Sequence, residues 1–176
     1  MRAAGLQFDV VVTNVDESIQ HNETPRDYVR RLAAEKSAEA MRLSRERGGD
    51  EVVIVGADTS VVIGSAILGK PVDDRDAAAM LRRLSGQRHE VLTGISVRRG
   101  ASELGSVEAT TVEFSMLSEA DIAWYVASGE GRDKAGGYAI QGLASRFIPR
   151  IEGSYSNVVG LPVAALYTLI EQIARC

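Results

Sequence analysis

The sequence predicts an α/β fold with a mixed sheet, and three observations lead to this expectation. Helix-start signals, β-branched runs and glycine-bearing turns mix along all 176 residues. The apolar run Val52–Val55 is typical of a buried strand, and Gly-Ala-Asp-Thr interrupts it at residues 56–59. A two-residue hairpin signal, Gly64-Ser65, follows soon after. We therefore expect one α/β domain over residues 1–176.

Each element of the first half has a local signal. Thr24 as N-cap and Pro25 at the first helical position predict the start of a long helix. The Gly64-Ser65 turn sets a register that pairs Ile63 with Ala66, and hence Thr59 with Lys70. In order, we expect the end of a helix (Met1–Ala4), a strand (Phe8–Val12), a long helix (Pro25–Arg47), a buried strand (Val52–Gly56), a hairpin (Ser60–Leu68) and a helix (Asp73–Leu84).

The second half continues in the same way. Ser118 and Asp121 have the spacing of a capping box, so a helix should begin there and stop at Gly129. Glycines make 133–142 irregular, and this segment is either a plain loop or a place where backbone amides approach a ligand. The remaining elements are three strands and a final helix: Val91–Val97, Val107–Phe114, Phe147–Ile151 and Pro162–Ala174.

Composition is that of an ordinary globular protein. Hydrophobic residues make up 45% and charged residues 25%, and the chain is long enough to bury a core. The formal net charge of −4 argues against a nucleic-acid binder or a binder of anionic membranes. The only cysteine, Cys176, excludes internal disulfides and cysteine-based metal sites. No apolar run approaches a membrane span, so we expect a cytoplasmic protein.

Lys36 is the most unusual charge in the sequence. The residues at helical spacing around it form one apolar stripe: Val29, Leu32, Ala33, Ala40 and Leu43. Either the stem of Lys36 packs on this stripe while its amine reaches water, or the charge has a function. The spacing alone leaves both explanations open.

Asp58 is a second candidate, because open α/β sheets keep their chemistry at the mouths of buried strands. The hairpin register places the backbone of Asp58 one step from Lys70. An ideal pleat would nevertheless point their side chains to opposite faces. From position alone, a functional pair and a surface salt bridge worth at most about 1 kcal/mol are equally good explanations.

A series of short motifs, found in one order along nearly the whole chain, resembles the Maf family. They are Asp16-Glu17, Glu23-Thr24-Pro25, Ala34-Glu35-Lys36, Gly56-Ala57-Asp58-Thr59, Leu68-Gly69-Lys70-Pro71, Leu84-Ser85-Gly86, His89-Glu90-Val91-Leu92-Thr93-Gly94, Asp133-Lys134-Ala135-Gly136-Gly137-Tyr138-Ala139-Ile140-Gln141-Gly142, Ile151-Glu152-Gly153-Ser154-Tyr155 and Asn157-Val158-Val159-Gly160-Leu161-Pro162.

The resemblance implies a cytoplasmic nucleoside triphosphate pyrophosphatase with a house-cleaning role. Such an enzyme hydrolyses its substrate to the monophosphate and pyrophosphate and uses a divalent cation (Mg²⁺, Mn²⁺ or Co²⁺). The implied fold is an elongated mixed β-sheet flanked by helices, with two lobes around a central cleft, as in inosine triphosphate pyrophosphatases. A homodimer is often implied as well.

The resemblance also implies roles for individual residues. Asp58 matches the proton acceptor that activates water, and Glu17 matches an acidic residue that helps Asp58 to hold the metal. Lys36 and Lys70 match lysines that neutralise phosphate charge. Lys134, in the glycine-rich segment, is expected to bind substrate.

Two positions resemble the branch of the family that acts on dTTP, UTP and modified uridine nucleotides. These are Thr59, in Ala-Asp-Thr, and Gln141, in Tyr-x-Ile-Gln-Gly. A glutamine amide offers both a donor and an acceptor to a pyrimidine edge. The alternatives are the same reaction on another nucleotide, such as 7-methylguanosine triphosphate, or a nucleotide-binding, division-regulating protein with impaired catalysis.

One departure from the family lies at the N-terminus. The family opens with an apolar strand and a Ser-x-Ser-Pro-Arg-Arg loop, which binds phosphate and supplies an arginine linked to specificity. Met1–Leu6 resembles the end of the next helix, so roughly 15 to 20 residues are expected to be missing. A misassigned start would hide a complete enzyme, whereas a genuine truncation would impair it. We favour the first explanation, because every other site position is present.

Overall fold

A computed structural model describes residues 5–46 and 52–175. The predicted helix end at Met1–Ala4 and the last residue of the predicted long helix, Arg47, lie outside the described residues. In chain order the elements are α1 (Pro25–Glu46), β1 (Ile54–Ile63), β2 (Ala66–Leu68), α2 (Asp74–Leu84), β3 (Arg88–Arg99), β4 (Ser102–Glu113), α3 (Glu119–Ser128), η2 (Ala135–Gly137), η3 (Leu143–Phe147), β5 (Arg150–Glu152), α4 (Tyr155–Val159) and α5 (Val163–Ile173).

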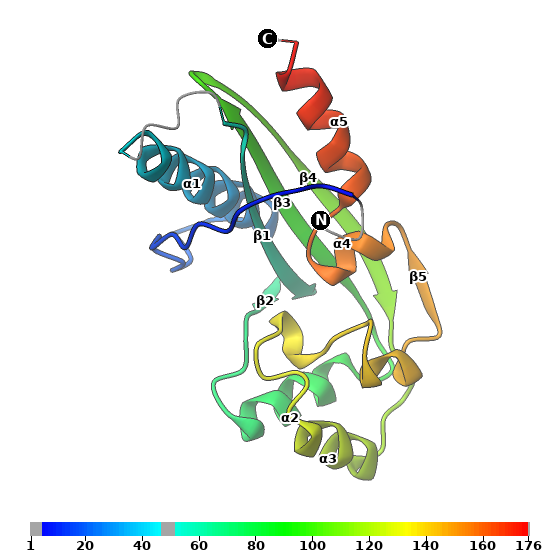
Figure 1. The fold of residues 1–176 in the computed structure, drawn as a ribbon. Helices are drawn as coiled ribbons and strands as arrows, with labels where there is room; N and C mark the ends of the chain where they lie inside the picture. The colour runs from blue at the N-terminus through cyan, green and yellow to red at the C-terminus, as the bar shows by residue number, and fades with distance from the viewer. Residues whose placement is uncertain (1–4, 47–51, 176) are drawn as a thin grey trace. The chain divides into compact units, whose positions relative to one another are not determined.

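The strands form one five-stranded sheet in the order β2-β1-β3-β4-β5 (Figure 1). β1 and β2 pair antiparallel with Ile63 opposite Ala66, which confirms the predicted hairpin register. The ladder ends at the pair Val61 and Leu68, and β2 ends there too, so the predicted pairing of Thr59 with Lys70 lies beyond it. β5 pairs antiparallel with β4. The predicted α/β fold class is confirmed.

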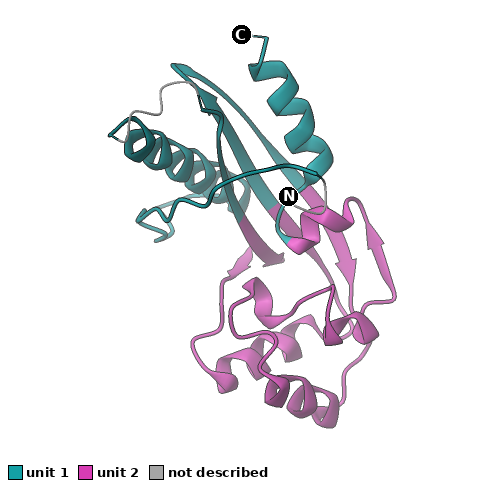
Figure 2. Ribbon diagram, viewed as in Figure 1, with its two compact units in different colours: residues 1–58, 93–108, 160–176 teal, residues 59–92, 109–159 magenta. Residues whose placement is uncertain are grey.

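The chain divides into two compact units, coloured separately in Figure 2. Unit 1 consists of residues 1–58, 93–108 and 160–176. Unit 2 consists of residues 59–92 and 109–159. β3 and β4 therefore contribute residues to both units, and β1 passes from one to the other after Asp58.

Unit 1 consists of strand segments with α1 and α5 on opposite faces (Figure 1). Ile95 and Val97 of β3 are buried and pack in one cluster with Leu166, Leu169 and Ile173 of α5. Because successive side chains of a strand point to opposite faces, the alternate residues of β3 face α1. Ser96 accordingly contacts α1, where its hydroxyl lies 2.7 Å from that of Ser37.

Two glycines let α1 approach the sheet closely. A Cβ at Gly56 of β1 would overlap backbone atoms of Ala33 and Ser37, and one at Gly94 of β3 would overlap the backbone of Val29. Only a residue without a side chain fits at these two contacts. The glycine that seemed to end a strand in the sequence therefore serves helix packing instead.

Unit 2 has a separate hydrophobic core. Tyr125 of α3, Leu81 and Leu84 of α2, and Phe114 are almost completely buried in it. Local signals start both helices as the sequence predicted. Asp73 caps α2, and the capping box of Ser118 and Asp121 starts α3, which ends at a left-handed Gly129.

Three expectations were wrong. Phe8–Val12 has no strand structure, and Val10 and Val12 are exposed; its run of β-branched residues suggested a strand, but a strand also needs a ladder partner. β1 does not end at Gly56 but spans ten residues, from Ile54 to Ile63, so Asp58 lies inside a strand and not at its mouth. Phe147 belongs to η3, and β5 begins only at Arg150.

The helices formed by the described residues include none that is long and apolar enough to cross a membrane.

Candidate active site

Asp58 and Lys36 come together because of the way α1 packs on β1. Residues two apart on a strand point to the same face, so Asp58 shares a face with Gly56. Gly56 lies directly against the backbone of Ala33 and Ser37 on α1. Lys36, one residue before Ser37, therefore lies within reach of the carboxylate. The position of Asp58 along β1, and not the end of a strand, decides this contact.

Lys36 binds two carboxylates at once. Its Nζ lies 2.7 Å from Oδ1 of Asp58, to which it donates a hydrogen bond, and 2.7 Å from Oε1 of Glu17. The Asp58 side chain is only 12% exposed and that of Lys36 22%, whereas Glu17 is 58% exposed. The cluster thus has a shielded side, at Asp58, and an open side, at Glu17.

The charge on Lys36 is maintained by its partners. Burial alone would lower the pKa of its ammonium, but hydrogen bonds from Lys36 to Asp58 and Glu17 outweigh this effect, so the pKa lies above its usual value. Lys36 is therefore a cation at neutral pH. The predicted alternative, in which the amine of Lys36 merely reaches water from an apolar stripe, does not describe these contacts.

Two residues for which no role was predicted hold Glu17 in place. The Tyr28 hydroxyl donates to the carbonyl of Glu17 at 2.8 Å. The Arg31 guanidinium donates to the carbonyls on either side, those of Asp16 and Ser18, at 3.3 and 3.0 Å. The same guanidinium forms a two-pronged contact with Glu23, at 2.6 and 2.9 Å. A loop without regular structure is thereby fixed to the helix that carries Lys36.

A sequence signal for these two residues did exist. Tyr28 and Arg31 are three positions apart on α1, and Arg31 is four before Glu35, so the three side chains share a stripe that borders Lys36. The i,i+4 pair of Arg31 and Glu35 would have been read as a local surface contact. Its contacts with the Asp16–Ser18 carbonyls could not have been read from spacing.

The two carboxylates of this cluster are also suitable ligands for a divalent cation that takes its remaining ligands from a substrate and from water. Asp58 and Glu17 place one carboxylate oxygen each on a common Nζ, so the two oxygens lie close together. Mg²⁺ typically takes one or two carboxylates and completes its shell with substrate phosphates and water. Within residues 5–46 and 52–175 no group of three or more His, Cys, Asp or Glu could hold a metal without such help.

Lys70 and Lys134, two of the predicted site residues, gather around Asp133 in unit 2. Nζ of Lys134 lies 2.7 Å from both carboxylate oxygens of Asp133. This hydrogen bond lowers the pKa of Asp133, and the positive charge of Lys70 makes a smaller contribution in the same direction. The amide of Gly136 donates to the carbonyl of Gly69 at 2.9 Å, which ties the glycine-rich segment to the residue before Lys70. All three side chains are exposed to solvent or nearly so.

Thr59 and Gln141, the two predicted specificity residues, also belong to unit 2. Gln141 is exposed and lies in a turn that the amide of Gly142 closes by donating to the carbonyl of Ala139 at 3.1 Å. Thr59 follows Asp58 on β1 and is half-buried, and the pleat of the strand points it to the face opposite Asp58.

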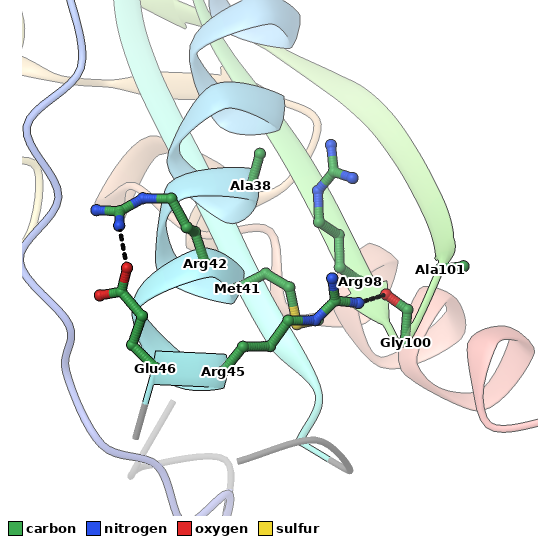
Figure 3. A pocket seen from close by; sticks show the side chains of 8 residues that line it. All are labelled: Ala38, Met41, Arg42, Arg45, Glu46, Arg98, Gly100 and Ala101. Carbon is green, nitrogen blue, oxygen red and sulfur yellow. Dashed lines mark hydrogen bonds and ion pairs between the residues drawn. The ribbon is translucent and has the colours of Figure 1, made fainter. Parts of the chain in front are cut away.

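A hollow of about 490 Å³ lies elsewhere in unit 1, beside the C-terminal part of α1 (Figure 3). Its lining includes three arginines, yet each has a partner: Arg42 pairs with Glu39 and Glu46, Arg45 donates to the carbonyl of Gly100, and Arg98 pairs with Glu103. None of the predicted site residues lines this hollow. It carries no excess of positive charge that would bind a triphosphate.

Comparison with known proteins shows the family of this chain. The model for Maf-like proteins matches residues 1–173. Similar curated proteins include the dTTP/UTP pyrophosphatase of Anaeromyxobacter dehalogenans strain 2CP-C, 49% identical over 172 residues, which are 96% of this chain and 84% of the relative. Those of Hahella chejuensis and Acinetobacter baylyi are 46% and 43% identical, over 96% and 98% of this chain and 83% and 92% of their own length. This chain belongs to the Maf family.

Proposed function

We propose that this protein hydrolyses dTTP and UTP to the monophosphate and pyrophosphate. Two lines of support meet here. The curated relatives named above are dTTP/UTP pyrophosphatases and match nearly all of this chain. The observation that carries the proposal is the ammonium of Lys36, bound at 2.7 Å to both Asp58 and Glu17 in a chain of this family.

Asp58 is the proposed general base. Its carboxylate accepts a proton from a water molecule as the oxygen of that water attacks the α-phosphorus. A new P–O bond forms, the bond from the α-phosphorus to the bridging oxygen breaks, and this oxygen leaves with pyrophosphate. The shielded position of Asp58 suits this role, because a carboxylate with little bulk solvent around it is held in one orientation.

The lysines are proposed to balance the charge of the triphosphate. Lys36 stays protonated at neutral pH, so it can keep Asp58 in place and offer positive charge to a nearby phosphoryl oxygen. Lys70 and Lys134 are proposed to bind phosphate oxygens of the substrate. Both are more exposed than Lys36, as residues that meet a ligand arriving from solvent should be.

A divalent cation (Mg²⁺, Mn²⁺ or Co²⁺) is proposed as the cofactor, with Glu17 and Asp58 as its protein ligands. When bound, it would neutralise the charge of the phosphate groups. The hydrogen bonds from Tyr28 and Arg31 hold the backbone around Glu17 on α1, the helix that carries Lys36.

Recognition of the nucleobase is assigned to Thr59 and Gln141. The exposed amide of Gln141 can donate one hydrogen bond and accept another, which matches the edge of a uracil or thymine ring. Thr59 follows the proposed general base, Asp58, directly in the chain.

The experiment is a panel of dTTP, UTP, CTP and 7-methylguanosine triphosphate, with pyrophosphate release measured in Mg²⁺ and after chelation. We expect dTTP and UTP to turn over fastest and the chelator to abolish release. Faster turnover of the methylated guanosine nucleotide would assign the other branch of substrates. Binding of UTP without any release of pyrophosphate would overturn the proposed enzymatic function.

A further inference from the structure

The turn that carries Gln141 is held at both ends by two residues that no role has yet been given, Tyr125 and Glu130. The turn spans Ala139 to Gly142, and Gln141 is its third residue. The hydrogen bond from Gly142 to Ala139 closes the turn, but it does not fix how the turn is oriented relative to the rest of unit 2. That orientation depends on what the flanking amides bind.

Tyr125 holds the first residue of the turn. Its hydroxyl accepts a hydrogen bond from the amide of Ala139 at 3.0 Å and donates one to Oε2 of Glu130 at 2.9 Å. The side chain is 1% exposed and its ring packs edge-on against Phe147. Burial raises the pKa of the Tyr125 hydroxyl, which therefore remains a donor at every pH at which the protein would work.

Glu130 holds the other end of the turn. Its carboxylate accepts hydrogen bonds from the amides of Leu143 at 2.9 Å and Ala144 at 3.4 Å, directly after the turn. A Cβ at Gly142 would overlap this carboxylate, so the closing residue of the turn lies directly against Glu130. One carboxylate thus joins the hydroxyl of Tyr125 to two amides beyond Gln141.

We propose that Tyr125 and Glu130 are positioning residues that set the orientation of the Gln141 amide and, through it, the preference of the enzyme for uracil and thymine bases. The inference rests on the proposed function, because Gln141 selects a base only if a pyrimidine nucleotide is the substrate. Neither residue needs to touch the substrate. They act by fixing the backbone on both sides of Gln141, so that its donor and acceptor meet one pattern of base edge.

Tyr125→Phe is the sharpest test, because it removes one oxygen and keeps the buried ring. The amide of Ala139 and the carboxylate of Glu130 would both lose a partner, and the turn could then shift. We expect the ratio of kcat/KM for UTP to that for CTP to fall about tenfold, the usual effect of one misplaced uncharged hydrogen bond. Glu130→Gln, which keeps the shape but loses the charge and one acceptor oxygen, should move the same ratio in the same direction.

Tyr138→Phe is the matched control. Tyr138 is also a buried tyrosine of the unit 2 core, but its hydroxyl bonds to Nε2 of His89 at 2.8 Å and not to the turn. It should lower the melting temperature and leave the UTP-to-CTP ratio unchanged. An unchanged ratio in Tyr125→Phe, or an equal fall in Tyr138→Phe, would overturn the inference while leaving the enzyme intact. Wild-type protein that releases no pyrophosphate from UTP or dTTP would overturn the proposed function, and this assignment with it.

Discussion

The two groups of candidate site residues differ in how firmly they are held. In unit 1, Lys36 and Asp58 come from a helix and a strand that touch through Gly56, and their side chains are largely shielded. In unit 2, Lys70, Lys134 and Gln141 lie in loops and turns and are mostly exposed. Both groups contain ion pairs, but Lys36 and Asp58 are shielded from solvent, whereas Lys134 and its partner Asp133 are more exposed.

This difference suggests a division of labour. Chemistry on a phosphoanhydride needs a base and a cation held within a fraction of an ångström, which regular elements provide better than loops do. Recognition of a nucleotide needs side chains that a ligand can reach from solvent. We therefore expect substitutions in the unit 1 cluster to lower kcat, and those among the exposed unit 2 residues to raise KM or change the preferred base.

Asp58→Asn should produce the largest effect. The amide has the shape of the carboxylate but cannot accept the proton of the attacking water, so kcat for UTP should fall about a thousandfold. Pyrophosphate release at saturating UTP measures it, with circular dichroism as the check on folding. Asp74→Asn is the matched control: it removes an exposed carboxylate, paired with Arg132, and should leave kcat within about twofold. Turnover retained in Asp58→Asn would remove Asp58 from the role of base.

Lys36→Met should come next. The apolar side chain can pack on the stripe of α1, but Asp58 and Glu17 lose their common ammonium, and we expect kcat to fall about a hundredfold. Arg42→Met provides the control, because it removes an exposed cation from the same helix. Equal losses in the two variants would mean that positive charge on α1 matters in general and that the place of Lys36 does not.

Gly56→Ala tests whether the close approach of α1 builds the unit 1 cluster. The added methyl group would overlap the backbone of Ala33 and Ser37, so α1 must move away from β1. We expect a loss of about 2–3 kcal/mol in the free energy of unfolding, measured in urea, together with a lower kcat. Gly69→Ala, where a Cβ would meet nothing within 4 Å, should leave the stability nearly unchanged. A stable and fully active Gly56→Ala protein would show that the approach is not needed.

Acid should destabilise the protein through a buried histidine of unit 2. His89 is 2% exposed in unit 2, and burial lowers its pKa from 6.5 to about 4, whereas His21 in unit 1 is exposed. Between these two values the unfolded chain binds the proton and the folded chain does not. The free energy of unfolding should therefore fall as the pH drops from about 6.5 to about 4, by up to about 1.4 kcal/mol per pH unit.

Urea unfolding at several pH values checks this slope. His21→Gln should keep it and His89→Gln should lose it, since only His89 is buried in its neutral form. The same slope in both variants would assign the acid sensitivity to other groups.

Much of the fold was readable from local signals. The N-cap at Thr24 with Pro25, the capping box at Ser118 and the turn at Gly64-Ser65 each depend on a few neighbouring residues, and each is confirmed. What failed needed long-range information. Phe8–Val12 has the β-branched residues of a strand but no ladder, and Gly56 serves the packing of a helix that begins about 30 residues earlier in the chain.

The candidate site was readable in part. Lys36 was conspicuous as a charge in an apolar stripe, and the resemblance to the Maf family implied roles for Asp58 and Glu17. Neither was predicted to contact Lys36: the hairpin register had placed Asp58 beside Lys70, whereas its carboxylate binds Lys36. The reasoning that placed Asp58 at the mouth of a strand was wrong, although the residue itself lies in the cluster. The contacts of Tyr28 and Arg31 with the carbonyls of residues 16–18 leave no trace in residue spacing, because any sequence offers such carbonyls.

The smallest expected effect gives the most direct test of the division between the two groups. Lys134→Gln removes a partly exposed cation from a loop, so KM for UTP should rise about threefold while kcat stays within about twofold of the wild type. Steady-state kinetics of Lys134→Gln and Asp58→Asn, measured side by side with UTP, should show a rise in KM for the first and a fall in kcat for the second. A fall in kcat as large for Lys134→Gln as for Asp58→Asn would contradict the account.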